Sequence, residues 1–299
     1  MMTVESPFAD QLKTIPTQKR EVSVLGSTTR YWVYGDAGAK TTVIVSHGYR
    51  GEHHGLEPVI AQLPQVRFIS PDLPGFGEST PLVGTAHDID GYAAWLTAFV
   101  AAIDEPDAIV LGHSFGTIVS AAALVAGLKT RALILVNPIA ISGLKGPHPI
   151  ATRITVAYYR LAALLPAKIG YALLKNWLIV QFMSSSLAKT KDRSRRKWIH
   201  SEHHTYFNRF ANRDVVVEAF LASISTDVSA FAAKISIPTL LVAAELDDIT
   251  PVAAQYVLQQ TFPNASLTVL PGVGHLIHYE VPAQAAQAMV DFLASLPET

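Results

Sequence analysis

The stretch AIVLGHSFGTIVSAAAL, residues 108–124, decides how this chain folds. It begins with an apolar run of the strand type and ends in a segment typical of a helix. Between them stands Gly-x-Ser-x-Gly, in which Gly112 and Gly116 flank Ser114. Glycines at these positions remove Cβ atoms that would collide in a sharp strand-to-helix turn. The pattern therefore predicts that Ser114 is held out at the start of a helix. There, free N–H groups and the positive end of the helix dipole can stabilise an oxyanion.

Strand and helix patterns alternate along the rest of the chain. The expected strands are 21–25, 29–34, 41–46, 67–70, 108–111, 132–136, 238–243 and 266–270. The expected helices are 56–63, 90–103, 117–124, 252–261 and 282–296. Alternating units of this kind predict an α/β fold with a doubly wound, mostly parallel sheet. Residues 138–228 show helical periodicity without a convincing strand, so we expect an inserted helical cap, with 1–137 and 229–299 forming the core.

Composition narrows the class of protein. A chain of 299 residues with 49% hydrophobic and 16% charged residues suits one large domain whose sheet is buried on both faces. The absence of cysteine excludes disulfides, a thiol nucleophile and thiolate metal ligands. Residues 1–13 contain no apolar signal segment, so we expect a cytoplasmic protein. The uncharged run 108–128 is long enough to span a bilayer, but its glycine-flanked turn argues against a membrane helix.

A serine hydroxyl needs a base and an acid to become a nucleophile. Histidine suits the task of the base because it titrates near neutrality. His275 follows strand 266–270, and Asp247 follows strand 238–243. Because ligands of doubly wound sheets bind beyond the carboxyl ends of the strands, both side chains are placed to meet Ser114 there. Ser114, Asp247 and His275 are thus the catalytic candidates. Asp248 and His278 are alternatives for the acid and the base, for which we expect hydrogen bonds within their loops.

Four motifs, taken together and in this order, resemble the α/β-hydrolase family with a helical cap. They are HGYRG at 47–51, DLPGFGES at 72–79, the turn at Ser114, and the pair AELD at 244–247 with GVGH at 272–275. The resemblance covers residues 22–136 and 238–296. It implies a Ser-Asp-His hydrolase whose acid lies four residues before a proline, which selects Asp247 before Pro251. Ala244 stands where the family has glycine. A serine at 114 also separates the chain from the family's dehalogenases and epoxide hydrolases, which carry aspartate there.

An oxyanion hole needs two N–H donors. The first expected donor is the backbone of Phe115, and the resemblance implies Tyr49 as the second, with Gly48 as the alternative. His47, Gly48, Arg50 and His113 are candidates for substrate binding. Arg50 lies beside a proposed donor and could meet a substrate carboxylate or phosphate, although an exposed arginine or a salt bridge with Glu52 is the favoured interpretation.

Histidine clusters at 53–54 and 200–204 invite a metal interpretation. No further ligand set accompanies them, and serine hydrolases of this type need no metal. We therefore expect neither a metal nor a cofactor, and we expect these histidines at the surface or packed in the cap.

The formal charge is unevenly spread. Residues 138–228 carry thirteen Lys and Arg against five Asp and Glu, whereas the remainder carries ten against nineteen. Six cations gather in 189–197, and no acidic residue lies between Asp107 and Asp192. Apolar helices with isolated cations can lie at a membrane interface or roof a pocket with their cations turned outward. Peripheral contact with an anionic membrane is therefore an alternative, and nucleic-acid binding is not expected.

These features predict a serine hydrolase that cleaves a carboxylic ester, with an apolar acyl chain, through an acyl-enzyme on Ser114. The expected substrate is a small-molecule ester or a lipid-like molecule. Carbon–carbon bond hydrolysis and acyl transfer remain alternatives within the same fold. A non-catalytic ligand- or membrane-binding protein is the alternative from another class.

Overall fold

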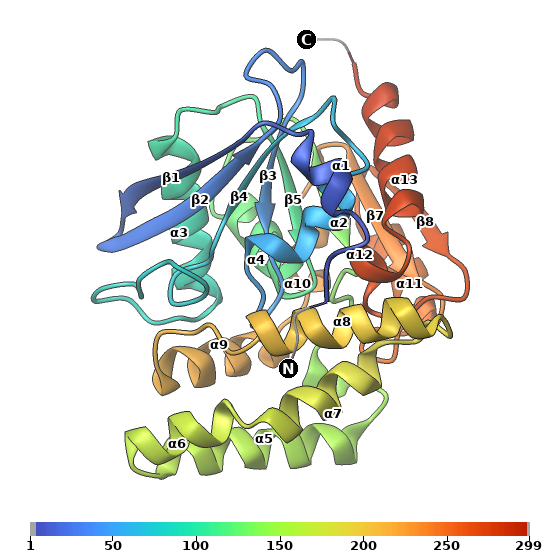
Figure 1. Cartoon of the computed structure of the whole chain (residues 1–299). Helices are drawn as coiled ribbons and strands as arrows, with labels where there is room; N and C mark the ends of the chain where they lie inside the picture. The colour runs from blue at the N-terminus through green and yellow to red at the C-terminus, as the bar shows by residue number, and fades with distance from the viewer. Residues whose placement is uncertain (1–3, 298–299) are drawn as a thin grey trace.

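The computed structural model describes residues 4–297, whose core is a single twisted sheet (Figure 1). Within this range, eight strands are arranged in the order β1-β2-β4-β3-β5-β6-β7-β8. Their bounds are β1 (Thr17–Val24), β2 (Ser27–Tyr34), β3 (Thr42–Ser46), β4 (Arg67–Pro71), β5 (Ile109–His113), β6 (Leu133–Val136), β7 (Thr239–Ala244) and β8 (Ala265–Leu270). The pairs β1–β2 and β2–β4 are antiparallel, and all others are parallel. The predicted doubly wound, mostly parallel sheet is confirmed.

Helices cover both faces of the sheet. One face packs against α3 (Ile89–Ala102), α4 (Phe115–Val125) and α10 (Ser229–Ala232). The other packs against α2 (Glu57–Ile60) and α13 (Pro282–Ser295). Successive residues of a strand point to opposite faces, so Ile44 belongs to the first core and its neighbours Val43 and Val45 to the second. Because both faces are buried, the parallel strands are continuous apolar runs.

The segment between β6 and β7 carries most of the remaining helices, and we call residues 138–228 the cap. It contains η2 (Gly143–Lys145), α5 (Pro149–Leu164), α6 (Ala167–Leu174), α7 (Trp177–Leu187), α8 (Arg193–Tyr206) and α9 (Arg213–Ser225). Helices α8 and α9 lie nearer the sheet, and α5, α6 and α7 form the layer farthest from it (Figure 1). This arrangement places the cap over the carboxyl ends of the parallel strands.

Element bounds differ from the sequence prediction in a few places. Strand β1 begins at Thr17, four residues before the predicted start at residue 21. The sequence did not indicate this part of the strand because its four residues are polar and exposed and show no apolar alternation. The helix expected at 56–63 is a short turn, η1 (His53–Leu56), followed by the single turn of α2. Short helices α1 (Ala9–Lys13) and α12 (Ile277–Glu280) were not predicted, and α11 (Val252–Thr261) was.

The uncharged run at 108–128 is divided between β5 and α4, as its glycines predicted. Across residues 4–297, none of the helices combines the length and the apolar character needed to cross a membrane.

Candidate active site

Ser114 lies on a strained turn between β5 and α4. Its backbone has φ 51° and ψ −117°, a left-handed conformation that is costly for a residue with a side chain. The flanking glycines are required by close backbone approach. A Cβ at Gly112 would lie 2.5 Å from the carbonyl oxygen of Gly116, and one at Gly116 would lie 1.9 Å from that of Ser46. Tight packing of this turn against β3 therefore holds Ser114 out at the N-terminus of α4.

We expect Gly116→Ala to destabilise the protein by at least about 3 kcal/mol, because backbone and not a flexible side chain occupies the space of the new methyl group. Urea unfolding at equilibrium would measure the loss. Gly38→Ala is the matched control, since Gly38 is exposed and only Asp36 Oδ1, at 3.3 Å, approaches its Cβ position. Equal stability of the two variants would contradict this account of the turn.

Three side chains form a continuous hydrogen-bonded relay. Ser114 Oγ lies 2.8 Å from His275 Nε2, and His275 Nδ1 lies 2.7 Å from Asp247 Oδ2. His275 and Asp247 are only 5% and 6% exposed. Donation from Nδ1–H to the carboxylate leaves the lone pair on Nε2 facing the serine hydroxyl. The arrangement can therefore take the proton of Ser114 and stabilise the resulting imidazolium.

Asp247 is held as a carboxylate by its surroundings. Burial alone would raise its pKa, but the neighbouring His275 and the N–H groups of Ile249 and Thr250 outweigh burial and lower the pKa. Both N–H groups donate to Oδ1, at 2.8 and 3.2 Å. The other oxygen, Oδ2, faces His275 and accepts the hydrogen bond from its Nδ1–H.

Asn137 supports this carboxylate and was not predicted from the sequence. Its Nδ2 donates to Asp247 Oδ2 at 3.2 Å, and its backbone N–H donates to the carbonyl of Val242 at 2.8 Å. Asn137 has φ 49°, a left-handed conformation that asparagine tolerates better than most residues. The only sequence signal was the Asn-Pro pair that ends β6, which indicates a turn and not a role beside the acid.

The alternative acid and base lie outside the relay. Asp248 is exposed and forms an ion pair with Lys189 of the cap. His278 is buried and packs 4.2 Å from the ring of His113 and 4.1 Å from that of Tyr279. Burial, with nearby imidazoles adding to it, holds the pKa of His278 well below its usual range. The loop hydrogen bond expected for His278 is not among the hydrogen bonds of the described residues, and its buried Nδ1 has no partner there.

The loop at 47–51 lies against the nucleophile. A Cβ at Gly48 would be 3.3 Å from Ser114 Cβ, so glycine allows this approach. His47 fixes the loop by donating from Nδ1 to the carbonyl of Gly48 at 2.8 Å and accepting at Nε2 from the N–H of Leu73 at 2.9 Å. Burial lowers the pKa of His47, which suits this neutral form. In the described part of the chain, the Tyr49 and Phe115 N–H groups donate to no protein acceptor.

A cavity of about 460 Å³ lies between the core and the cap, and Ser114 and His275 open into it. His47, Gly48 and His113, three of the substrate-binding candidates, also line it. Most of its wall is apolar and comes from core and cap alike: Tyr49, Leu56, Phe115, Ile139, Ile154, Tyr158, Tyr159, Ile179, Phe182, Met183, Leu187, Phe207, Phe220, Ile224, Ile249, Leu276 and Tyr279. Such a wall suits a flexible hydrocarbon chain.

Arg50, the fourth substrate-binding candidate, does not line this cavity. Its buried guanidinium donates to the carbonyls of Phe207 and Leu174 at 3.0 and 2.9 Å, and to Asn208 Oδ1 at 2.7 Å. All three acceptors belong to the cap, so Arg50 ties the loop at 47–51 to the cap. The salt bridge expected with Glu52 is likewise not among the ion pairs of residues 4–297.

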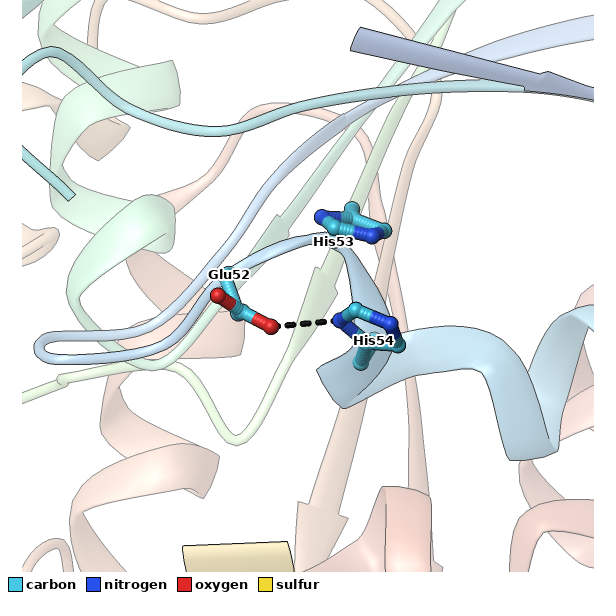
Figure 2. A group of neighbouring side chains, drawn as sticks. All are labelled: Glu52, His53 and His54. Carbon is cyan, nitrogen blue, oxygen red and sulfur yellow. Dashed lines mark hydrogen bonds and ion pairs between the residues drawn. The ribbon is translucent and has the colours of Figure 1, made fainter. Parts of the chain in front are cut away.

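Three potential metal ligands, Glu52, His53 and His54, do lie together, with one ligand atom each within 4.8 Å (Figure 2). Each of the three already uses one of these atoms in a protein contact, although Glu52 Oε2 has no partner among the described residues. His53 Nδ1 lies 2.8 Å from the buried carboxylate of Asp72, and His54 Nδ1 is hydrogen-bonded to Glu52. The two rings stack on Trp32 and Tyr206 respectively. We interpret the group as hydrogen-bonded packing residues.

The second histidine cluster packs inside the cap. His200 and His203 share the hydroxyl of Ser184, at 2.5 and 2.7 Å, and His204 Nε2 lies 2.8 Å from Gln181 Oε1. These contacts join α8 to α7. They account for the i, i+4 spacing of His200 and His204 without a bound ion.

Glu202 of α8 lies over α2 beside a small cavity, with Glu57, Glu52 and His54 nearby. Burial, with the two glutamates adding to it, raises the pKa of Glu202 to about 7, although His54 opposes the shift. The folded state therefore favours the protonated form. The Glu202 carboxyl therefore makes its full contribution to the free energy of unfolding below the unfolded pKa of about 4.3. This contribution is lost as the pH rises through about 7.

We accordingly expect Glu202→Gln to exceed the wild type in stability by about 2 kcal/mol at pH 8, with little difference at pH 4.5. Urea unfolding at both pH values would test this expectation. Asp107→Asn, at an exposed position without an ion pair among the described residues, is the control. A difference in stability between Glu202→Gln and the wild type that stays the same at both pH values would contradict this expectation.

The chain is similar to known proteins in both sequence and structure. The model of the Alpha/beta hydrolase family matches residues 43–288. The pimeloyl-[acyl-carrier protein] methyl ester esterase of Aeromonas hydrophila subsp. hydrophila is 28% identical over 246 residues, covering 80% of this chain and 89% of the relative.

Two solved structures share the fold. A bacterial membrane phospholipase A aligns with a TM-score of 0.76 at 16% identity, covering 97% of this chain and 90% of that one. The enol-lactonase of Burkholderia xenovorans LB400 aligns with a TM-score of 0.77 at 17% identity, covering 92% and 100%.

The chain therefore belongs to the α/β hydrolase family. Within that family it is an enzyme of the esterase type, a carboxylic ester hydrolase.

Proposed function

We propose that this protein is a serine hydrolase that cleaves an ester with an apolar acyl chain. Ser114 Oγ attacks the ester carbonyl while His275 Nε2 takes its proton. The N–H groups of Phe115 and Tyr49 receive the negative charge that develops on the carbonyl oxygen. His275 then protonates the leaving alcohol, and an acyl-enzyme remains on Ser114. Water, deprotonated by His275, releases the acid and restores the serine.

The observation that carries this proposal is the unbroken relay from Ser114 through His275 to Asp247, with both contacts at hydrogen-bonding distance. A protein that only bound a ligand would have no physical need for a buried carboxylate aimed at the imidazole. The apolar cavity at Ser114 supports a hydrocarbon acyl chain. The relative from Aeromonas, named as an esterase of an acyl-chain methyl ester, supports the same class of substrate.

A series of p-nitrophenyl esters of increasing acyl length would test the substrate class. We expect kcat/KM to rise with chain length while the chain gains apolar contact, and to fall once it exceeds the cavity. An added alcohol that diverts the acyl group from water would identify acyl transfer instead. Turnover of a vinylogous diketone without turnover of any ester would favour carbon–carbon bond hydrolysis and contradict the proposal.

A further inference from the structure

The outer helices of the cap expose an unusual amount of apolar surface. Helices α5, α6 and α7 comprise 35 residues (16, 8 and 11) but hold eight of the sixteen large hydrophobic side chains that are exposed among residues 4–297. Leu164 is 85% exposed, and Leu178 is 63% exposed. On α5, the exposed residues Ile150, Ile154, Leu161 and Leu164 follow helical spacing and share one face. Contiguous apolar surface of this kind marks a contact site.

The charge of the same helices is entirely positive. Arg153 and Arg160 lie on the exposed face of α5, and Lys168 and Lys175 are exposed on and just after α6. None of these four forms an ion pair with another described residue. No acidic residue lies between Asp107 and Asp192 to offset them. Apolar side chains interleaved with unpaired cations are complementary to an anionic lipid surface.

The active-site cavity reaches the surface at this face. Ile154 of α5 and Phe182 of α7 are 66% and 73% exposed, yet both also line the cavity that contains Ser114. The layer formed by α5, α6 and α7 lies on the side of the cap away from the sheet (Figure 1). A lipid surface that covered this layer would therefore cover the rim of the cavity as well.

The basic run at 189–197, the strongest charge cluster in the sequence, is partly committed to internal contacts. Arg195 donates to the carbonyls of Tyr279 and Glu280 at 3.1 and 3.0 Å, and Arg196 donates to that of Ala188 at 3.1 Å. Lys189 pairs with Asp248 of the core. Half of its six cations thus hold α8 and the α7–α8 connection in place, whereas the cations of α5 and α6 form no ion pair among the described residues.

We propose that the outer face of α5, α6 and α7 docks on an anionic lipid surface and opens the cavity toward it. Resting on the proposed function, this docking lets an acyl chain pass from the lipid to Ser114 without crossing water. The substrate class is then an ester that resides in a membrane, and the isolated cations select membranes rich in anionic headgroups.

Docking can be measured with the full chain carrying Ser114→Ala, so that no lipid is hydrolysed. Vesicles of phosphatidylcholine with and without phosphatidylglycerol would be sedimented with the protein. We expect binding only to the anionic vesicles, weakened by salt. In the same background, Leu164→Ser with Leu178→Ser, and separately Arg160→Gln with Lys168→Gln, should each weaken binding at least about tenfold.

Matched pairs on the core provide the controls. Val83→Ser with Val257→Ser removes apolar groups that are 68% and 65% exposed. Lys129→Gln with Lys234→Gln removes two exposed cations. Both pairs should bind vesicles within about twofold of the parent. Absence of binding to any vesicle, or equal losses in the cap and core pairs, would overturn the proposal. So would a concentration-dependent dimer that the cap pair abolishes, without vesicle binding, since the face would then join two copies of the chain.

Failure of docking is distinguishable from failure of the proposed function. With Ser114 intact, the cap pairs should hydrolyse a short water-soluble p-nitrophenyl ester at the wild-type rate without vesicles. They should also lose the preference, about tenfold, for a long-chain ester presented in anionic vesicles over one in neutral vesicles. Vesicle binding without turnover of any ester would overturn the ester chemistry and leave the docking supported. Turnover without a preference for anionic vesicles would overturn the docking.

Discussion

Replacing Ser114 with alanine is expected to lower kcat/KM for a p-nitrophenyl ester by at least about 10⁴-fold. The alanine leaves the oxyanion donors and the cavity in place but removes the hydroxyl oxygen that lies 2.8 Å from His275 Nε2. No acyl-enzyme can then form, so a fluorophosphonate should label the wild type at Ser114 and leave the variant unlabelled. Steady-state kinetics and intact-protein mass spectrometry would measure the two effects.

Ser266→Ala is the matched control, because this serine is exposed on β8 and lines a different cavity. It should retain the wild-type rate and the label at Ser114. The Ser114→Ala protein should unfold at the wild-type urea concentration, which would show that the loss is chemical. Ester turnover by Ser114→Ala at more than about a tenth of the wild-type rate would contradict the serine mechanism.

The second large effect is expected from Asp247→Asn, which should lower kcat about 10³- to 10⁴-fold with a small change in KM. The amide would donate to His275 Nδ1 where the carboxylate accepts, so the imidazole would carry its proton on Nε2 and could not take one from Ser114. It would also leave an imidazolium without its counter-charge. Kinetics with a saturating ester would separate the effect on kcat from that on KM.

Asp248→Asn is the matched control, because it makes the same substitution at the neighbouring residue. The neighbouring carboxylate is exposed and pairs with Lys189, so its loss should change kcat by less than about threefold. A larger loss from Asp248→Asn than from Asp247→Asn would assign the acid to Asp248 and contradict the relay proposed here.

Features that depend on neighbours along the chain could be predicted from the sequence. The apolar runs identified the strands of the sheet, and the glycines around Ser114 indicated the strand-to-helix turn, because both properties reside in a few consecutive residues. The order Ser114, Asp247, His275, each placed after a strand, brought the three candidates to one edge of the sheet. The helical cap followed from the change of period at residue 138. For the same reason, the polar first half of β1 and the short helices gave little signal.

The direction of each side chain was decided only by the tertiary structure. Asp247 and Asp248 are adjacent and chemically identical, and only the backbone of their loop turns one toward His275 and the other toward Lys189. Arg50 is committed to acceptors more than 120 residues away, at Leu174 and beyond. Asn137 meets Asp247 across 110 positions of sequence. Local periodicity cannot report such contacts. By itself, then, the sequence determined the class of fold and the order of the catalytic candidates. Long-range packing decided which carboxylate, which cations and which face of the cap are available for function.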